Sequence, residues 1–163
     1  MAQILGWLEE EATGKTALYY TAGATAFLLI WTPFLLTLLT IIGVDISSIP
    51  DSTEKMANSS PFLVIFTILV EETIFRIIPL WLAVKNKFTI KGLLAFSAIN
   101  SVVFGYIHGW VLIKILFPGV GSMVFCLLFL KCGGIKSNFL PACLAPIVSH
   151  LLYDAVRFAV VLS

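Results

Sequence analysis

The stretch LVEETIFRII, residues 69–78, places two glutamates and an arginine in one of the most apolar parts of the chain. A charged side chain at the centre of a membrane helix costs around 2.5–3.5 kcal/mol, so such residues usually face protein or water and serve a function. Glu72 and Arg76 are four residues apart with the acid first, the favourable order for an ion pair on one helix face. Glu71 lies about 100° away around the helix and cannot share Arg76 equally. We therefore interpret Glu72 and Arg76 as a structural pair and Glu71 as the candidate general base.

The only two histidines of the chain, His108 and His150, also fall in apolar segments. Phe104 precedes His108 by four residues in FGYIH, and Asp154 follows His150 by four in HLLYD. A spacing of four puts two side chains on the same helix face. We therefore expect His150 and Asp154 to present a joint polar surface to the interior of a helix bundle. The alternative is that Asp154 pairs with Arg157 and that His150 only bonds a backbone carbonyl.

These residue types fit the hydrolysis of a peptide bond. The reaction needs a base for water, a hydrogen-bond donor for the oxyanion and an acid for the leaving amine. Glu71 can supply the base, His150 the donor, and either protonated Glu71 or His108 the acid, if three helices converge. No serine lies in a nucleophile turn. Two histidines and Glu71 would form a His₂Glu zinc set, but HExxH is absent, so we expect no metal and no other cofactor.

Three motifs follow one another on three apolar segments: EExxxR at 71–76, FxxxH at 104–108 and HxxxD at 150–154. In order, spacing and context they resemble the CAAX protease and bacteriocin-processing family, also called Abi, which includes the type II CAAX prenyl endopeptidases. The motifs cover residues 71–154, just over half of the chain. The resemblance implies an intramembrane endopeptidase of the glutamic type, whose site lies within the bilayer.

The resemblance also implies a role for each residue of the first two motifs. Glu71 would activate the attacking water, and Glu72 would be a supporting residue held by Arg76. His108 would place the water or assist Glu71, with Phe104 in support.

The third motif departs from the prenyl endopeptidases, which have asparagine at the position of Asp154. The resemblance implies that His150 and Asp154 stabilise the oxyanion, but an ionised aspartate cannot donate a hydrogen bond. We therefore expect Asp154 to orient His150 or to keep it protonated, with His150 as the donor.

Composition indicates a membrane protein. Of the 163 residues, 60% are hydrophobic and 12% charged, against roughly 45–50% and about 25% in ordinary soluble domains. A soluble domain of this length has too little interior for so much apolar surface, so we expect one all-α multi-pass membrane domain over residues 1–163. The net charge is +1 without a basic run, so we expect no nucleic acid among the partners. The expected partners are the lipid bilayer and a peptide or membrane-protein substrate.

A bilayer core of about 30 Å requires ~20 apolar residues per helix. Four stretches are long enough, namely residues 17–44, 61–84, 92–117 and 138–162. A fifth, 118–130, is short for a full span and is expected to be tilted or re-entrant. We expect Ile4, Leu5, Trp7 and Leu8 to form one face of a short interfacial helix. The cysteines Cys126, Cys132 and Cys143 are interpreted as packing residues.

The lysines predict the orientation. The loop KNKFTIK carries three of them, Lys85, Lys87 and Lys91. Residues 45–60 carry one lysine and three acids, so the positive-inside rule places the KNKFTIK loop and the N-terminus in the cytoplasm. If 118–130 crosses the bilayer, the same side also holds Lys131 and Lys136.

Two other readings stay open at this point. Buried Glu, Asp and His side chains also form proton relays, so a proton-coupled carrier or a bacteriocin-immunity factor without proteolytic activity is the alternative function. The carrier is less favoured because the chain has no internal repeat. Among substrates, a prenylated CAAX tail, a bacteriocin leader and a membrane-bound regulator are equally compatible with the motifs.

Overall fold

The computed structural model describes residues 2–12, 14–44, 59–109, 113 and 115–161, and the described part is helical without strands. Its elements, in order, are α1 (Ala2–Glu9), α2 (Lys15–Ile41), α4 (Pro61–Glu72), η2 (Thr73–Ile77), α5 (Ile78–Lys85), α6 (Ile90–Ile107), η3 (Ile115–Gly119), α8 (Val120–Phe129), η4 (Leu130–Gly134) and α9 (Phe139–Val161). The elements labelled η are π-helical turns.

Four helical segments in the described part are long and apolar enough to cross a membrane: Lys15–Ile41, Ile90–Ile107, Ile115–Gly134 and Phe139–Val160. The predicted span at 61–84 also forms, as a run of α4, η2 and α5, but the π-helical turn η2 divides it. The prediction of an all-α multi-pass membrane protein is therefore confirmed.

The boundary between the third and fifth predicted spans is different from the prediction. Helix α6 ends at Ile107, and His108 and Gly109 form a turn, so the span expected to reach residue 117 is shorter. Residues 115–117 belong instead to the next helical run, which reaches Gly134 and is long enough to cross. Hydropathy could not locate this break because both helices are apolar on either side of it. Part of the connection, 110–112 and 114, lies outside the described residues.

Pro79 accounts for the π-helical turn in the second span. Proline has no N–H and its ring clashes with the carbonyl four residues earlier, which here is that of Phe75. The helix accommodates the ring by taking up one extra residue per turn, and the N–H of Ile78 bonds the carbonyl of Thr73, five residues back. The carbonyl of Phe75 thereby loses its α-helical donor.

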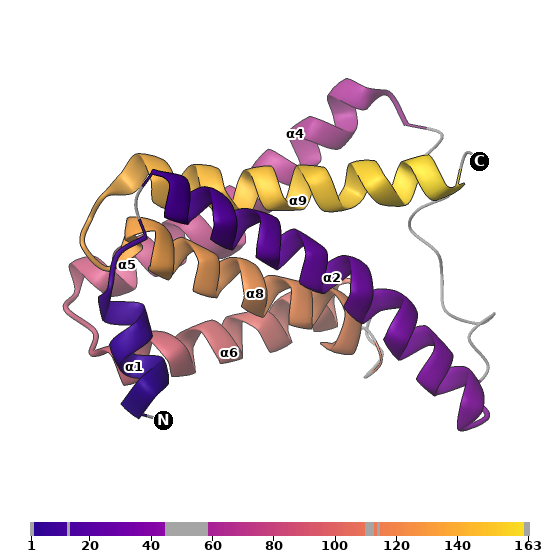
Figure 1. The fold of residues 1–163 in the computed structure, drawn as a ribbon, viewed down its shortest axis with the longest axis horizontal. Coiled ribbons are helices and arrows are strands. Elements are labelled where there is room, and N and C mark those ends of the chain that lie inside the picture. Colours follow the sequence, from indigo (N-terminus) through magenta and orange to yellow (C-terminus); the bar gives the residue numbers. More distant parts are fainter. Residues whose placement is uncertain (1, 13, 45–58, 110–112, 114, 162–163) are drawn as a thin grey trace.

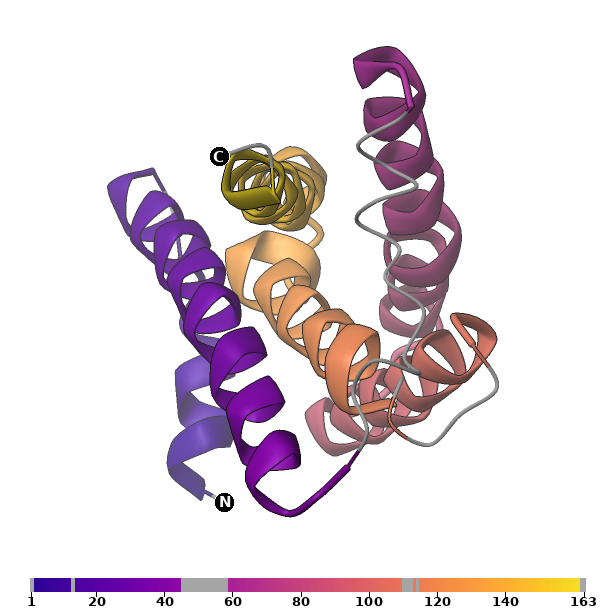
Figure 2. The ribbon, with the colours of Figure 1, turned by 90° about the vertical axis from the view of Figure 1, so that its right-hand side faces the viewer.

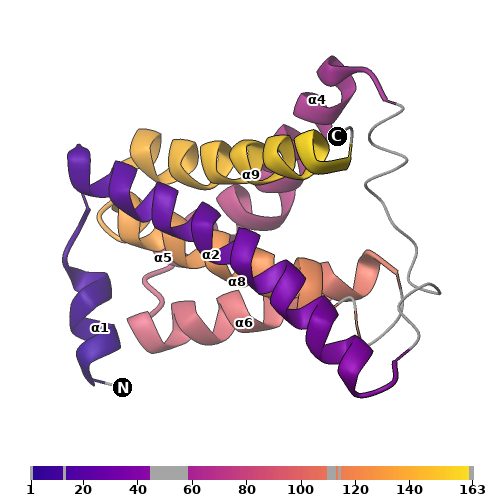
Figure 3. The same ribbon diagram turned by 45° about the vertical axis from the view of Figure 1, so that its right-hand side comes forward.

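Helix α8 lies in the middle of the bundle, with α2, α4, α6 and α9 around it (Figures 1 and 2). Half of the span that contains α8 is buried, against about a third or less of the other three. Helices α2 and α9 run side by side (Figure 3). Hydrogen bonds join them at two places, between Thr25 Oγ1 and Ser149 Oγ at 2.9 Å and between Thr32 Oγ1 and the Tyr153 hydroxyl at 2.7 Å.

Small residues bring α6 close to the run of η3 and α8. On α6 they recur every four residues, at Ser97, Ser101 and Gly105, and all three are buried. A Cβ added to Gly119 would lie 3.0 Å from the carbonyl oxygen of Ser101, so the two backbones approach closely there. Such contacts are typical of helix pairs in membranes, where packing replaces the hydrophobic effect between helices.

The N-terminal helix α1 is fastened to the bundle by Lys131. The buried Lys131 ammonium donates hydrogen bonds to the carbonyls of Trp7 and Glu10. It also lies 4.8 Å from the ring centroid of Trp7. Leu8, expected on the face of an interfacial helix, is 1% exposed and packs into the core instead. The cysteines are free thiols, and Cys126 and Cys132 are buried.

The close approach at Gly119 predicts an unequal effect of two similar substitutions. Gly119→Ala should lower the melting temperature in detergent, because the new methyl group must push on the Ser101 backbone and overpacking costs about 1–3 kcal/mol. Gly121→Ala is the control, since its Cβ would meet only Leu28 Cδ2 at 3.9 Å. Both gain helix propensity equally, so equal melting temperatures would contradict the close packing.

Candidate active site

Glu72 and Arg76 form an ion pair in the centre of the bundle. Arg76 Nη1 donates to Glu72 Oε1, and the two residues are fully buried. The guanidinium of Arg76 also lies over two aromatic rings, at 4.5 Å from the centroid of Phe104 and 5.0 Å from that of Phe125. Cation–π contact stabilises a desolvated guanidinium. The predicted structural pair is therefore present, and aromatic side chains from α6 and α8 hold it.

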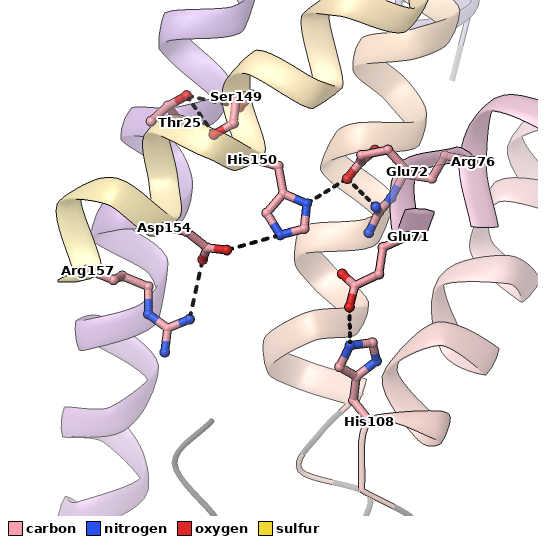
Figure 4. A network of polar contacts seen from close by, with 9 residues as sticks. All are labelled: Thr25, Glu71, Glu72, Arg76, His108, Ser149, His150, Asp154 and Arg157. Atoms are coloured by element: carbon pink, nitrogen blue, oxygen red, sulfur yellow. Dashed lines mark hydrogen bonds and ion pairs between the residues drawn. The ribbon is translucent and has the colours of Figure 1, made fainter. Parts of the chain in front are cut away.

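His150 connects this pair to the last helix (Figure 4). Its Nδ1 lies 2.7 Å from Glu72 Oε1, and its Nε2 lies 3.5 Å from Asp154 Oδ2. The ring stacks on Phe125 at a centroid distance of 4.9 Å. His150 is thus placed between two carboxylates, one on α4 and one on its own helix. The contact with Glu72, from a residue 78 positions away, was not expected from the sequence.

Asp154 faces two cationic or potentially cationic groups. Besides His150 it approaches Arg157, whose Nη1 lies 3.8 Å from Asp154 Oδ1. Asp154 thus approaches both partners considered from the sequence, and the alternative in which His150 only bonds a backbone carbonyl is wrong, because His150 contacts two carboxylates. Asp154 is 6% exposed, whereas the side chain of Arg157 is about a third exposed.

Glu71 and His108 make a separate contact on the more open side of the site (Figure 4). His108 Nε2 lies 3.6 Å from Glu71 Oε1, and their side chains are 33% and 25% exposed. His108 Nδ1 lies 2.7 Å from the carbonyl oxygen of Phe104. Because a carbonyl oxygen only accepts, Nδ1 carries the proton and Nε2 is the atom presented to Glu71.

The turn that ends α6 explains this orientation. His108 is the C-terminal cap of α6, and its ring lies 4.2 Å from that of Phe104, one helical turn earlier. The end of the helix, which hydropathy did not predict, thus leaves the imidazole partly exposed rather than inside a span.

All seven residues singled out from the motifs lie in one network, contributed by the second span, α6 and α9. Phe125 on α8 was missed, although it contacts both Arg76 and His150. Nothing in the sequence distinguishes Phe125 from the other phenylalanines of an apolar segment. In the described part of the chain, no three His, Cys, Asp or Glu side chains are grouped as a metal site.

The architecture and the site define a multi-pass membrane protein with a polar centre assembled from separate helices. Residues 54–156, more than half of the chain, match the family model for type II CAAX prenyl endopeptidase Rce1-like proteins. The chain therefore belongs to this family of CAAX intramembrane proteases, as the three motifs indicated. No curated protein and no solved structure matches it.

The two adjacent glutamates should differ in their effect on stability. Glu72→Gln or Arg76→Gln leaves one member of a buried ion pair without its partner, a change that costs about 3–5 kcal/mol in soluble proteins. Both variants should melt well below wild type in detergent. Glu71→Gln is the matched control, because Glu71 lies next to Glu72 in sequence but is outside the buried pair, and it should melt close to wild type. Three indistinguishable melting curves would contradict the structural role of the pair.

Proposed function

We propose that the protein is an intramembrane endopeptidase of the glutamic type, in which Glu71 activates the attacking water. The proposal rests on one observation: two adjacent carboxylates differ in their burial and in their bonding partners. Glu72 is fully buried and bonded to Arg76 and His150. Glu71 is partly exposed and faces His108 at 3.6 Å. A general base must be reachable by its substrate, and of the two glutamates only Glu71 meets that requirement.

The orientation of His108 supports the binding of a water molecule that bridges the two side chains from one side. With its proton on Nδ1 and bonded to Phe104, neutral His108 offers a lone pair at Nε2. The Glu71 carboxylate is also an acceptor. Two acceptors that face each other suit one water molecule that donates a hydrogen bond to each, and this leaves the oxygen lone pairs available for attack.

The proposed reaction conserves protons within the site. Glu71 removes one proton as the water oxygen bonds the peptide carbonyl carbon. The C–N bond then breaks, and Glu71 returns this proton to the leaving amine, either directly or by way of Nε2 of His108. No metal takes part in this scheme.

His150 is the proposed donor to the oxyanion. Its Nδ1–H donates to Glu72, so Nε2 is the ring atom available to a substrate. The contact of Nε2 with Asp154 is 3.5 Å long, longer than a good hydrogen bond, and substrate can replace it. A ring that donates from both nitrogens is an imidazolium, whose charge Glu72 and Asp154 both compensate. Asp154 therefore acts through His150 and takes the place of the family's asparagine.

The family description favours a prenylated CAAX peptide as substrate. The proposed orientation puts the N-terminus and the loop of Lys85 and Lys91 in the cytoplasm, according to the positive-inside rule.

Glu71→Gln should abolish cleavage of a prenylated CAAX peptide in proteoliposomes. Loss of a general base typically lowers the rate roughly 10²–10⁴-fold. Thr73→Val, an exposed neighbour without a site contact, is the matched control and should retain activity. Residual turnover within about tenfold of wild type would remove Glu71 as the base. Treatment with a chelator tests the zinc alternative and should leave activity unchanged. The metal-free scheme would be overturned if the purified protein contained stoichiometric zinc, lost its activity when the chelator removed the zinc, and regained it when zinc was added back.

His150 and Asp154 should behave as one unit. If Asp154 acts only by holding His150, then His150→Ala should be nearly as damaging as the double variant with Asp154→Ala. Asp154→Asn should keep measurable activity, because an amide can still bond the imidazole. Rates of the two single variants and the double variant decide the matter. If the rate loss of the double variant equals the product of the two single-variant losses to within a factor of about two, the residues act independently.

A further inference from the structure

The carbonyl of Phe75, which Pro79 deprives of its helical donor, is satisfied from another helix. Asn100 on α6 donates from Nδ2 to this carbonyl oxygen. In a membrane there is little water to satisfy a freed carbonyl, so such a group requires a partner within the protein. Asn100 therefore compensates for the break that Pro79 makes in the second span.

The position of this bond matters because the π-helical turn η2 begins directly after Glu71 and Glu72. The extra residue in a π-helical turn rotates the helix before it, here α4, relative to the helix after it, here α5. The direction in which Glu71 points thus depends on how η2 is seated on α6. Single π-helical turns occur frequently at functional sites.

Asn100 lies on the same face of α6 as the FxxxH motif. Asn100, Phe104 and His108 are spaced by four residues, so they follow one another along one side of the helix. Each of the three contacts the second span: Asn100 bonds the Phe75 carbonyl, the Phe104 ring lies 5.3 Å from the ring of Phe75, and His108 faces Glu71. The FxxxH motif is therefore the second half of a longer contact stripe.

The side chain of Asn100 is itself held in place by a third helix. Its Nδ2 lies 3.8 Å from the Sγ of the buried Cys126 on α8, within reach of a weak sulfur contact. The amide is thus located where the second span, α6 and α8 meet, two turns of α6 away from the Glu71 and His108 pair.

We propose that Asn100 is a positioning residue for catalysis: by anchoring the π-helical turn to α6, it sets the separation between Glu71 and His108. The inference rests on the proposed role of Glu71. It assigns to Asn100 no contact with substrate or water. A displacement on the order of 1 Å at a reacting pair can lower turnover about 10²-fold, so a single anchor of this kind is kinetically important.

The test is Asn100→Leu, which keeps the size of the side chain and removes the amide donor. Turnover per folded molecule should fall roughly 10–100-fold with KM within about twofold of wild type, because substrate contacts are unchanged. Asn100→Gln keeps a donor and should restore part of kcat. Ser101→Ala is the control: Ser101 is the next residue of α6, and its hydroxyl donates to the Ser97 carbonyl of the same helix rather than to the second span.

A second test, which measures melting temperature in a Pro79→Ala variant, remains decisive if Asn100→Leu folds poorly. Pro79→Ala restores an N–H four residues after Phe75, which can bond the freed carbonyl within the helix. In that background, adding Asn100→Leu should lower the melting temperature less than it does in wild type. An equal loss in both backgrounds would overturn the assignment of Asn100 to this carbonyl.

Failure of the inference is separable from failure of the proposed function. If Glu71→Gln is inactive but Asn100→Leu keeps wild-type kcat, or loses no more than Ser101→Ala, Asn100 has no positioning role. If Glu71→Gln remains active, the mechanism on which the inference rests is wrong. In both cases the kinetic constants are measured on protein that elutes as a folded species, with the same prenylated CAAX peptide.

Discussion

One carboxylate oxygen, Glu72 Oε1, receives both Arg76 and His150, and the rest of the site depends on that shared contact. A buried glutamate is costly unless it is paired and hydrogen-bonded. Arg76 supplies the compensating charge from the same span, and His150 brings the compensating donor from α9. Glu72 thereby fixes the last helix against the second span. Asp154 and Phe125, which contact His150 from other directions, keep the imidazole in this position.

Because Arg76 and His150 both bind Glu72, the adjacent Glu71 is left outside the buried ion pair. Two adjacent residues on a helix point about 100° apart, so one can face the closed interior and the other the open side of the site. Glu72 is fully buried, whereas a quarter of the Glu71 side chain is exposed. A glutamate held in a buried ion pair and a partly exposed glutamate thus occupy consecutive positions. This explains physically why two glutamates occur together where one would already be expensive.

Local spacing predicted the parts of the site that lie within one helix. The pairing of Glu72 with Arg76 and the approach of His150 to Asp154 both follow from a separation of four residues. The contact between His150 and Glu72 depends on how helices pack, which periodicity does not encode. The end of α6 at Ile107 was missed for another reason, since apolar residues continue on both sides of the turn and hydropathy has no signal there. Pro79 was a readable signal for the broken span, because proline removes the donor for the carbonyl four residues earlier.

The same constraint connects the backbone break to the polar side chains. Within a bilayer each unsatisfied group must find a partner in the protein, so one polar feature requires another. Pro79 frees the carbonyl of Phe75, and Asn100 on α6 bonds it. Phe104 bonds His108 through its carbonyl and contacts Arg76 through its ring. Asn100, Phe104 and His108 thus contact the second span along a single face of α6, and this packing brings Glu71 and His108 together.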